Sequence, residues 1–247
     1  MYRFWLASVG VCVLFATGLR ADDKDDAKAI LDKAIKAQGG EDKLAKPKCV
    51  TMKIKGKYYG PGAGDDGIEY TMEISTTPSK RRIDMEAGGG IFKFSTVYNG
   101  DKGWRKLNDD TTDLDKEGLE EVKHDLYLDK VTSLVPLKEK DYKLEALAEC
   151  KVGKKAAVGI KVTHKGNRDV SLFFDKESGL LLRLDTTVKD MGEEHNQETV
   201  YSEHKEFDGR KMPTKVVINR DGKLYVEGET SEVKFPEKLE DNVFAKP

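Results

Sequence analysis

Two short segments have the residue types and spacing of known ligand-binding loops. Residues 62–67, Gly-Ala-Gly-Asp-Asp-Gly, match the G-x-G-x-x-G pattern of a dinucleotide-binding turn. Such a turn requires a strand before it and a helix after it, so that the helix N-terminus meets the phosphates. Here a strand-like segment follows, and Asp65 and Asp66 would repel an anion. The pattern therefore predicts a hairpin loop.

A second segment, residues 113–118, begins like a calcium-binding loop with the sequence Asp-Leu-Asp-Lys-Glu-Gly. The twelfth position of such a loop carries a bidentate glutamate, whereas this chain has His124 there. We interpret the segment as the entrance of a helix whose first turn is capped by Asp115.

The histidines and the familiar catalytic motifs give no indication of an enzyme. None of the histidines belongs to an H-E-x-x-H motif or another close ligand pair on a helix. The chain also lacks the G-x-S-x-G turn of hydrolases and the G-x-x-x-x-G-K-[ST] phosphate loop. The sequence therefore predicts a protein that is not an enzyme and needs no metal or cofactor. The four histidines are His124, His164, His195 and His204.

The remaining candidate chemistry is the recognition of an apolar ligand. Flexible methionines and aromatic side chains recur on the predicted strands and on a nearby turn, and such side chains adapt to an apolar ligand of variable shape. An ordinary core is the alternative, because any sheet covered by helices has an apolar face. The candidate ligand-binding residues are Met52, Tyr58, Tyr70, Met72, Phe92, Phe94 and Trp104, and Met85 has the same character.

Two amphipathic helices are predicted to position this face. In residues 26–38 apolar side chains recur at helical spacing, and Gly39-Gly40 provides a left-handed end. A second apolar stripe runs through residues 116–131. We expect both helices to pack on the same face of a sheet, with apolar side chains buried at Ile30, Leu31, Ile35, Leu119, Val122 and Leu126.

From residue 48 the apolar period changes to two, which is typical of half-buried antiparallel strands. Such evenly spaced strands predict an α+β fold with a single curved antiparallel sheet. No segment rich in Pro, Gly or Ser divides the chain. The predicted strands are residues 50–58, 68–74, 81–86, 91–98, 142–150, 157–164, 170–175, 180–188, 198–207, 212–219 and 224–235.

The composition predicts a water-soluble domain that does not bind nucleic acid. Of 247 residues 36% are charged, and 43 basic residues against 45 acidic ones leave a formal charge of −2. There is no excess of basic side chains to neutralise phosphates. Enough apolar residues remain to form a core.

Residues 1–21 have the pattern of a secretory signal peptide. Arg3 precedes an apolar stretch from Phe4 to Leu19, and the small residue Ala21 stands before Asp22. A transmembrane anchor is the alternative, but the stretch is shorter than the ~20 residues that a spanning helix needs. Residues 22–247 are then one exported domain. Its two cysteines, Cys49 and Cys150, would meet an oxidising compartment, and the sequence leaves open whether they form a disulfide.

A series of turn-and-strand signatures covers nearly the whole chain after residue 21. In chain order they are Gly39-Gly40-Glu41, Asn99-Gly100-Asp101-Lys102-Gly103-Trp104, Val152-Gly153-Lys154-Lys155-Ala156, Leu172-Phe173-Phe174-Asp175 with Ser178-Gly179-Leu180-Leu181, Phe207-Asp208-Gly209 with Met212-Pro213, and Asn242-Val243-Phe244-Ala245-Lys246-Pro247. Their order and spacing resemble the outer-membrane lipoprotein-sorting (LolA/LolB-like) superfamily.

The resemblance implies an unclosed half β-barrel of about eleven antiparallel strands, with helices packed on its concave face. It also implies an acyl-chain-binding cavity and a location in the bacterial periplasm. The function expected first is a monomeric, non-catalytic carrier that binds the acyl chain of a lipid or lipoprotein and takes part in outer-membrane lipoprotein sorting. The alternatives are an envelope-protein sensor or scaffold without a ligand and, least favoured, a secreted hydrolase.

We predict that the chain is exported and cleaved near Ala21, because the apolar stretch is short and an acidic segment follows it at once. Intact-mass analysis of protein purified from its native host measures the start of the mature chain. A mature protein that still begins at Met1 would contradict the signal peptide and with it the periplasmic location.

Overall fold

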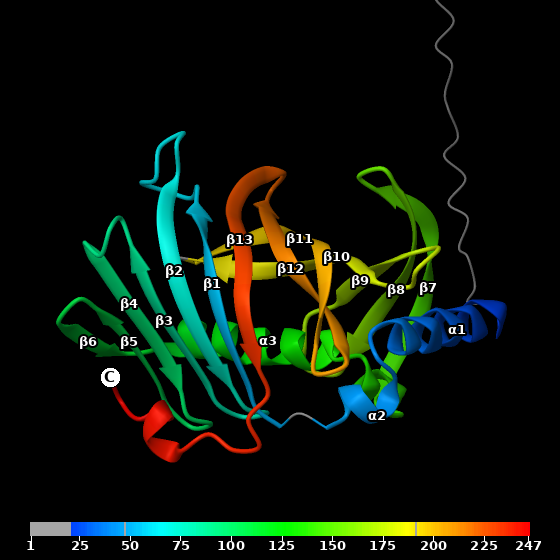
Figure 1. Cartoon of the computed structure of the whole chain (residues 1–247), viewed down its shortest axis with the longest axis horizontal. Coiled ribbons are helices and arrows are strands. Elements are labelled where there is room, and N and C mark those ends of the chain that lie inside the picture. The colour runs from blue at the N-terminus through cyan, green and yellow to red at the C-terminus, as the bar shows by residue number, and fades with distance from the viewer. Residues whose placement is uncertain (1–20, 47, 191) are drawn as a thin grey trace, which may run out of the picture.

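The computed structural model describes residues 21–46, 48–190 and 192–247 (Figure 1). The predicted signal peptide lies outside these residues except for Ala21, the first residue of helix α1. Among the described residues, no helix is long and apolar enough to cross a membrane. The helices are α1 (Ala21–Ala37), α2 (Glu41–Leu44) and α3 (Lys116–Thr132), with two short 3-10 helices, η1 (Val135–Lys138) and η2 (Asp241–Phe244).

All described strands belong to one antiparallel sheet of 13 strands. Its order is β6-β5-β4-β3-β2-β1-β13-β12-β11-β10-β9-β8-β7, so β6 and β7 are the two edges and the sheet is not closed into a barrel. The strands are β1 (Val50–Tyr58), β2 (Ile68–Thr76), β3 (Arg81–Ala87), β4 (Phe92–Tyr98), β5 (Gly103–Leu107), β6 (Asp110–Asp113), β7 (Tyr142–Val152), β8 (Lys155–His164), β9 (Val170–Asp175), β10 (Leu181–Asp190), β11 (Glu193–Phe207), β12 (Arg210–Arg220) and β13 (Lys223–Lys234).

The predicted fold class, an α+β fold built on a single unclosed antiparallel sheet, is confirmed. The count of about eleven strands is too low, because the apolar pattern did not reveal the short β5–β6 hairpin at one edge. This hairpin is dominated by polar residues, and it pairs from Trp104 with Asp113 to Leu107 with Asp110. Residues 62–67 form the β1–β2 hairpin loop, as expected.

Helix α1 packs on β7 and β8 through the face that its apolar spacing predicts. Leu31 and Ile35 are 2% and 4% exposed and join the main core, whereas Ile30 is only half-buried. The helix ends at Gly39 and Gly40, which both have positive φ. Gly39 passes so close to the β11–β12 turn that an added Cβ would lie 2.4 Å from the Gly209 carbonyl oxygen. Only glycine fits this helix end.

Helix α3 lies across the same face of the sheet (Figure 1). Asp115 caps the N-terminus of this helix, as predicted: its Oδ1 accepts a hydrogen bond from the Gly118 backbone N–H at 2.8 Å. Its buried stripe differs from the predicted one: Val122 is buried, but Leu119 and Leu126 are half-exposed. The apolar pattern correctly included Val122 and Tyr127, but it missed His124 because this buried residue is polar. The buried residues of α3 are Val122, His124, Tyr127 and Val131.

The two faces of the sheet follow from its register. Thr186 of β10 contacts His124 of α3, and Arg81 of β3 pairs with Asp129 of α3, so both strands present these residues to the concave face. Side chains alternate between faces, and directly paired residues share a face. The register therefore assigns the side chains of the remaining strands to the concave or the outer face.

Cys49 and Cys150 are both free thiols, the first buried and the second half-buried.

We predict that Leu31→Ala lowers the free energy of unfolding by about 2–5 kcal/mol, because the substitution leaves a cavity in the sealed core between α1 and the sheet. Leu126→Ala serves as the comparison and should cost less than about 2 kcal/mol, since Leu126 is half-exposed. Urea unfolding of both variants measures the difference. Equal losses would show that the two positions do not differ in packing.

Candidate functional site

Six of the seven candidate ligand-binding residues lie on one face of the sheet, on strands β1, β2 and β4. Met52 pairs with Ile74, and Tyr58 pairs with Ile68, across β1 and β2. Met85 of β3 pairs with both Met72 and Phe94, which places these on the concave face as well. The concave residues from the candidate set are Met52, Tyr58, Tyr70, Met72, Phe92 and Phe94.

Trp104 does not join these residues. It pairs with Val97 on the opposite, outer face, where both are buried beneath Phe244 of the C-terminal segment. The concave positions of β5 are instead Arg105 and Leu107, which pair with Thr96 and Phe94. Sequence reasoning placed Trp104 on a turn and so could not assign it a strand phase. Its role is to anchor the C-terminal segment against the sheet.

The concave face has a sealed half and an open half. On β8 and β9 the concave residues Ile160 and Leu172 are fully buried beneath the helices. On β1 to β5 the corresponding methionines and Phe94 are only half-buried, and Phe92 and Leu107 are each 43% exposed. We define the open half by its apolar concave residues, which are Met52, Ile54, Ile68, Met72, Ile83, Met85, Phe92, Phe94 and Leu107.

Tyr70 stands between the two halves and belongs more to the core than to the open half. It is 5% exposed, and its hydroxyl donates to the Glu227 carbonyl oxygen at 3.3 Å. The ring lies over two glycines that face each other in the register, Gly56 and Gly228. A Cβ at either glycine would lie within 3.0 Å of the Tyr70 hydroxyl. The two glycines therefore provide the space that this tyrosine fills.

Ion pairs tether helix α3 to the sheet on both sides. The Glu121 carboxylate accepts hydrogen bonds from two guanidinium nitrogens of Arg168. It also accepts a hydrogen bond from the Lys189 backbone N–H at 3.0 Å. On the other side the Arg81 guanidinium pairs with Asp129. His124 lies between these pairs against Thr186, and its burial lowers the pKa to about 4. Its imidazole is therefore neutral at physiological pH.

Asp125 lies one turn before Asp129 and has no ion pair with any described residue. Burial raises the pKa of Asp125 to about 6, the Arg81 charge opposes this, and the Asp129 and Glu121 carboxylates add to it. Burial likewise raises the pKa of Asp129 against the opposing effect of Arg81. The border between the helix and the open half is thus a polar strip around one arginine and two carboxyl groups.

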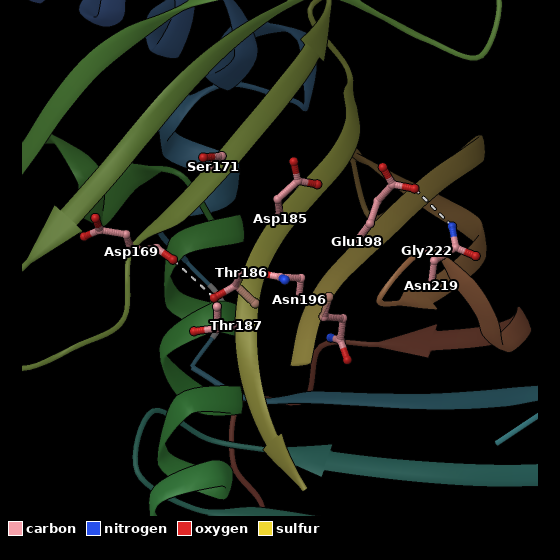
Figure 2. Close-up of a pocket in the computed structure, with 10 residues that line it drawn as sticks. Asp169, Ser171, Asp185, Thr186, Thr187, Asn196, Glu198, Asn219 and Gly222 are labelled. Atoms are coloured by element: carbon pink, nitrogen blue, oxygen red, sulfur yellow. Dashed lines mark hydrogen bonds between the residues drawn. The ribbon is translucent and has the colours of Figure 1, made fainter. Parts of the chain in front are cut away.

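A separate hollow of about 490 Å³ lies over β9 to β12, and nearly all the residues that line it have polar side chains (Figure 2). Asp185 and Glu198 are cross-strand neighbours, and Arg183 lies 3.1 Å and 3.4 Å from their carboxylates. The hollow contains none of the candidate residues. Within the described parts of the chain, no three His, Cys, Asp or Glu side chains converge to hold a metal ion. The hollow is lined by Asp169, Ser171, Asp185, Thr186, Thr187, Asn196, Gln197, Glu198, Asn219 and Gly222.

Solved structures share the arrangement of strands and helices over most of the chain. A LolA superfamily protein from Nitrosomonas europaea matches with a TM-score of 0.56 and 12% identity, covering 89% of this chain and 97% of that one. The chain therefore shares its fold with this protein. A DUF1329 family protein from Desulfovibrio piger gives a TM-score of 0.57 at 14% identity, with coverages of 89% and 97%.

A third structure is described as an outer membrane lipoprotein-sorting protein domain from Vibrio parahaemolyticus. It gives a TM-score of 0.52 at 12% identity and covers 90% of this chain and 97% of its own. No family model matches the sequence, and no curated protein matches it either. The predicted resemblance to the LolA-like superfamily is therefore confirmed at the level of the fold.

We predict that Asp125→Asn stabilises the protein near pH 7. The pKa of Asp125 is about 6 in the folded protein against an ordinary 3.8, so ionising it costs folding free energy as the pH rises through this range. The neutral amide avoids that cost, and we expect a gain of about 1–3 kcal/mol near pH 7. Well below pH 3.8, at about pH 2.5, the wild-type carboxyl is protonated in both states, so the gain should vanish.

Urea unfolding at both pH values measures the effect. Glu120→Gln on the exposed side of the same helix is the control and should change stability by less than about 0.5 kcal/mol at either pH. A gain from Asp125→Asn that is the same at both pH values would contradict the raised pKa.

Proposed function

We propose that this protein is a non-catalytic periplasmic carrier that holds the acyl chain of a lipid or lipoprotein on the open half of its concave face. The observation that supports this is the exposure of that half. Three methionines, Met52, Met72 and Met85, lie on adjacent strands with Phe94 beside them, and all four are only half-buried. A folded protein gains nothing by leaving such a face open unless a partner covers it.

The chemistry of this face suits a flexible hydrocarbon chain. Burying each CH₂ group contributes ~0.8 kcal/mol, so a long acyl tail can drive binding without a charged anchor. Unbranched methionine side chains follow an irregular chain more easily than branched ones. Phe92 and Phe94 stack with their ring centroids 6.4 Å apart and add an aromatic surface to this face. The face therefore accepts chains that differ in length.

The edge of the open half provides a place for a chain to enter. Phe92 and Leu107 are exposed there, and Ile91 at the β3–β4 turn is 71% exposed. Three glycines with positive φ, Gly88 to Gly90, precede Ile91 and form this turn. At the opposite end, the face ends at the polar strip formed by Arg81, Asp125 and Asp129. The fold shared with a lipoprotein-sorting domain and a predicted signal peptide support the same location and role.

We predict that a fluorescent fatty-acyl probe binds the purified protein saturably at micromolar concentrations. Met72→Asp and Phe94→Asp should each weaken binding at least tenfold, because the acyl chain would then contact a carboxylate that must lose its water. The Trp104 indole is not a suitable reporter, since it lies on the outer face. Probe fluorescence, and mass spectrometry of organic extracts from protein purified without detergent, measure binding.

Thr71→Asp is the matched control, because Thr71 is the exposed outer-face neighbour of Met72 on the same strand. It should bind the probe like wild type. Circular dichroism must first show that all three variants are folded. If the wild type carries no host lipid and binds no probe, the carrier is excluded, and an envelope-protein scaffold becomes the better proposal.

A further inference from the structure

A row of polar side chains crosses four neighbouring strands on the outer face of the sheet. Thr186 of β10 faces helix α3, so the adjacent Asp185 points to the opposite, outer face. The register pairs Asp185 directly with Ser171 of β9 and with Glu198 of β11, and Glu198 pairs in turn with Asn219 of β12. Figure 2 shows these four side chains in a row across the strands.

This row lines the polar hollow over β9 to β12, whose volume of about 490 Å³ is that of a ligand site. Pockets that bind small molecules have volumes of about 300–1,000 Å³. The four strands cover about 14 Å from β9 to β12, so the row is longer than one six-membered ring. The Asp185 and Glu198 side chains are 37% and 41% exposed. A ligand in the hollow can therefore reach both carboxylates from solvent.

The protein itself leaves much of the hydrogen-bonding capacity of this row unused. The Asp185 Oδ1 and the Arg183 Nε lie 3.1 Å apart, but neither makes a hydrogen bond to the other or to any other described residue. The Glu198 Oε1 accepts from the Asn219 side-chain amide at 3.0 Å, which leaves the amide oxygen of Asn219 as an acceptor. Further hydroxyl and amide groups at the hollow are those of Ser171, Thr187 and Asn196.

Arg183 already supplies a positive charge to the two carboxylates of the row. It lies 3.1 Å from Asp185 and 3.4 Å from Glu198, and its guanidinium stacks on the Phe173 ring at 4.1 Å from the centroid. Burial raises the pKa of Asp185, and the charge of Arg183 opposes this effect. A cationic ligand would have to approach the carboxylates beside a guanidinium of the same sign, at the cost of repulsion.

An anionic ligand is disfavoured by the carboxylates themselves. Asp169, Asp185 and Glu198 all line the hollow, and Lys161 already pairs with Asp169 at 2.7 Å. Ionised carboxylates only accept hydrogen bonds, so an anion would find repulsion and no donor there. A neutral ligand with many hydroxyl groups avoids both costs, because each hydroxyl can donate to a carboxylate and accept from an amide.

We propose that this hollow binds a neutral oligosaccharide, whose hydroxyl groups donate hydrogen bonds to Asp185 and Glu198 and accept one from the Asn196 amide. A saccharide presents hydroxyl groups in fixed directions along an extended chain, which matches side chains that strand pairing holds in a row. Hydrogen bonds from hydroxyls to ionised carboxylates are stronger than those between neutral groups. The site lies on the outer face, so it is independent of the proposed acyl-binding face.

Isothermal titration calorimetry of the whole protein tests this with trisaccharides that differ in charge. The neutral probes are maltotriose, cellotriose and triacetylchitotriose, the cationic probe is chitotriose, and the anionic probe is trigalacturonate. At least one neutral probe should bind saturably with a Kd at or below about 1 mM. That probe should bind at least fivefold more tightly than either charged one.

Two variants and a control locate the binding in the hollow. Asp185→Asn keeps the shape but replaces a charged acceptor, and Asn196→Ala removes an exposed amide, so each should weaken the neutral probe about fivefold. Glu69→Gln is the control, because Glu69 is an exposed carboxylate on the outer face of β2, outside the hollow. It should bind like wild type. Circular dichroism must show that all three variants are folded.

The outcomes separate this inference from the proposed carrier. If no neutral probe binds at about 10 mM, if chitotriose or trigalacturonate binds best, or if Asp185→Asn behaves like Glu69→Gln, the inference is wrong. Asp185→Asn should still bind the fluorescent acyl probe like wild type, and the trisaccharide should not displace that probe. Displacement would place both ligands on one face and would overturn the outer site. Failure of the acyl probe alone contradicts only the carrier.

Discussion

The pairing of β1 with β13 in the middle of the sheet determines the course of the rest of the chain. Every other pair of neighbouring strands is consecutive in sequence, so the two halves of the sheet grow outward from this seam. The first half ends at the edge strand β6, and the second half begins at the opposite edge, β7. The connecting segment must therefore cross the sheet. Helix α3, whose 17 residues span about 25 Å, makes that crossing on the concave face.

This crossing explains why the two halves of the concave face differ. Helix α1 adds a second layer over β7 and β8, and together with α3 it excludes water from that half. On the β1 to β5 half, α3 contributes Leu119, which lies against Gly103 of β5, and the carboxyl groups of Asp125 and Asp129, which face Arg81. The sealed half provides the stable core. The open half can then keep apolar side chains exposed without losing the fold.

The sequence predicted the strands and the apolar face well, because both depend on local alternation. Met52, Met72 and Phe94 share a face since each lies in phase on a strand of clear period two. Trp104 was misplaced because β5 and β6 are short and polar and show no such period. The same lack of local signal hid His124, whose partner Thr186 lies 62 residues away.

The polar strip was beyond the reach of sequence reasoning for a different reason. In a chain with 36% charged residues, nothing local distinguishes Arg81 or Asp125 from a solvated side chain. Their environment depends on the β1–β13 seam, which makes β6 and β7 the two edges of the sheet and so brings α3 over β3. Long-range strand pairing of this kind carries no periodic signature.

The β1–β13 pairing also brings two strand backbones unusually close together beside the open half. At the level of Tyr70 the backbones of β1 and β13 meet through Gly56 and Gly228, and a Cβ at Gly56 would lie 1.9 Å from the Glu227 carbonyl oxygen. At this level the tyrosine ring fills the space that the two glycines leave. The exposed apolar side chains of the open half and the buried side chains of the main core therefore occupy separate parts of one concave face.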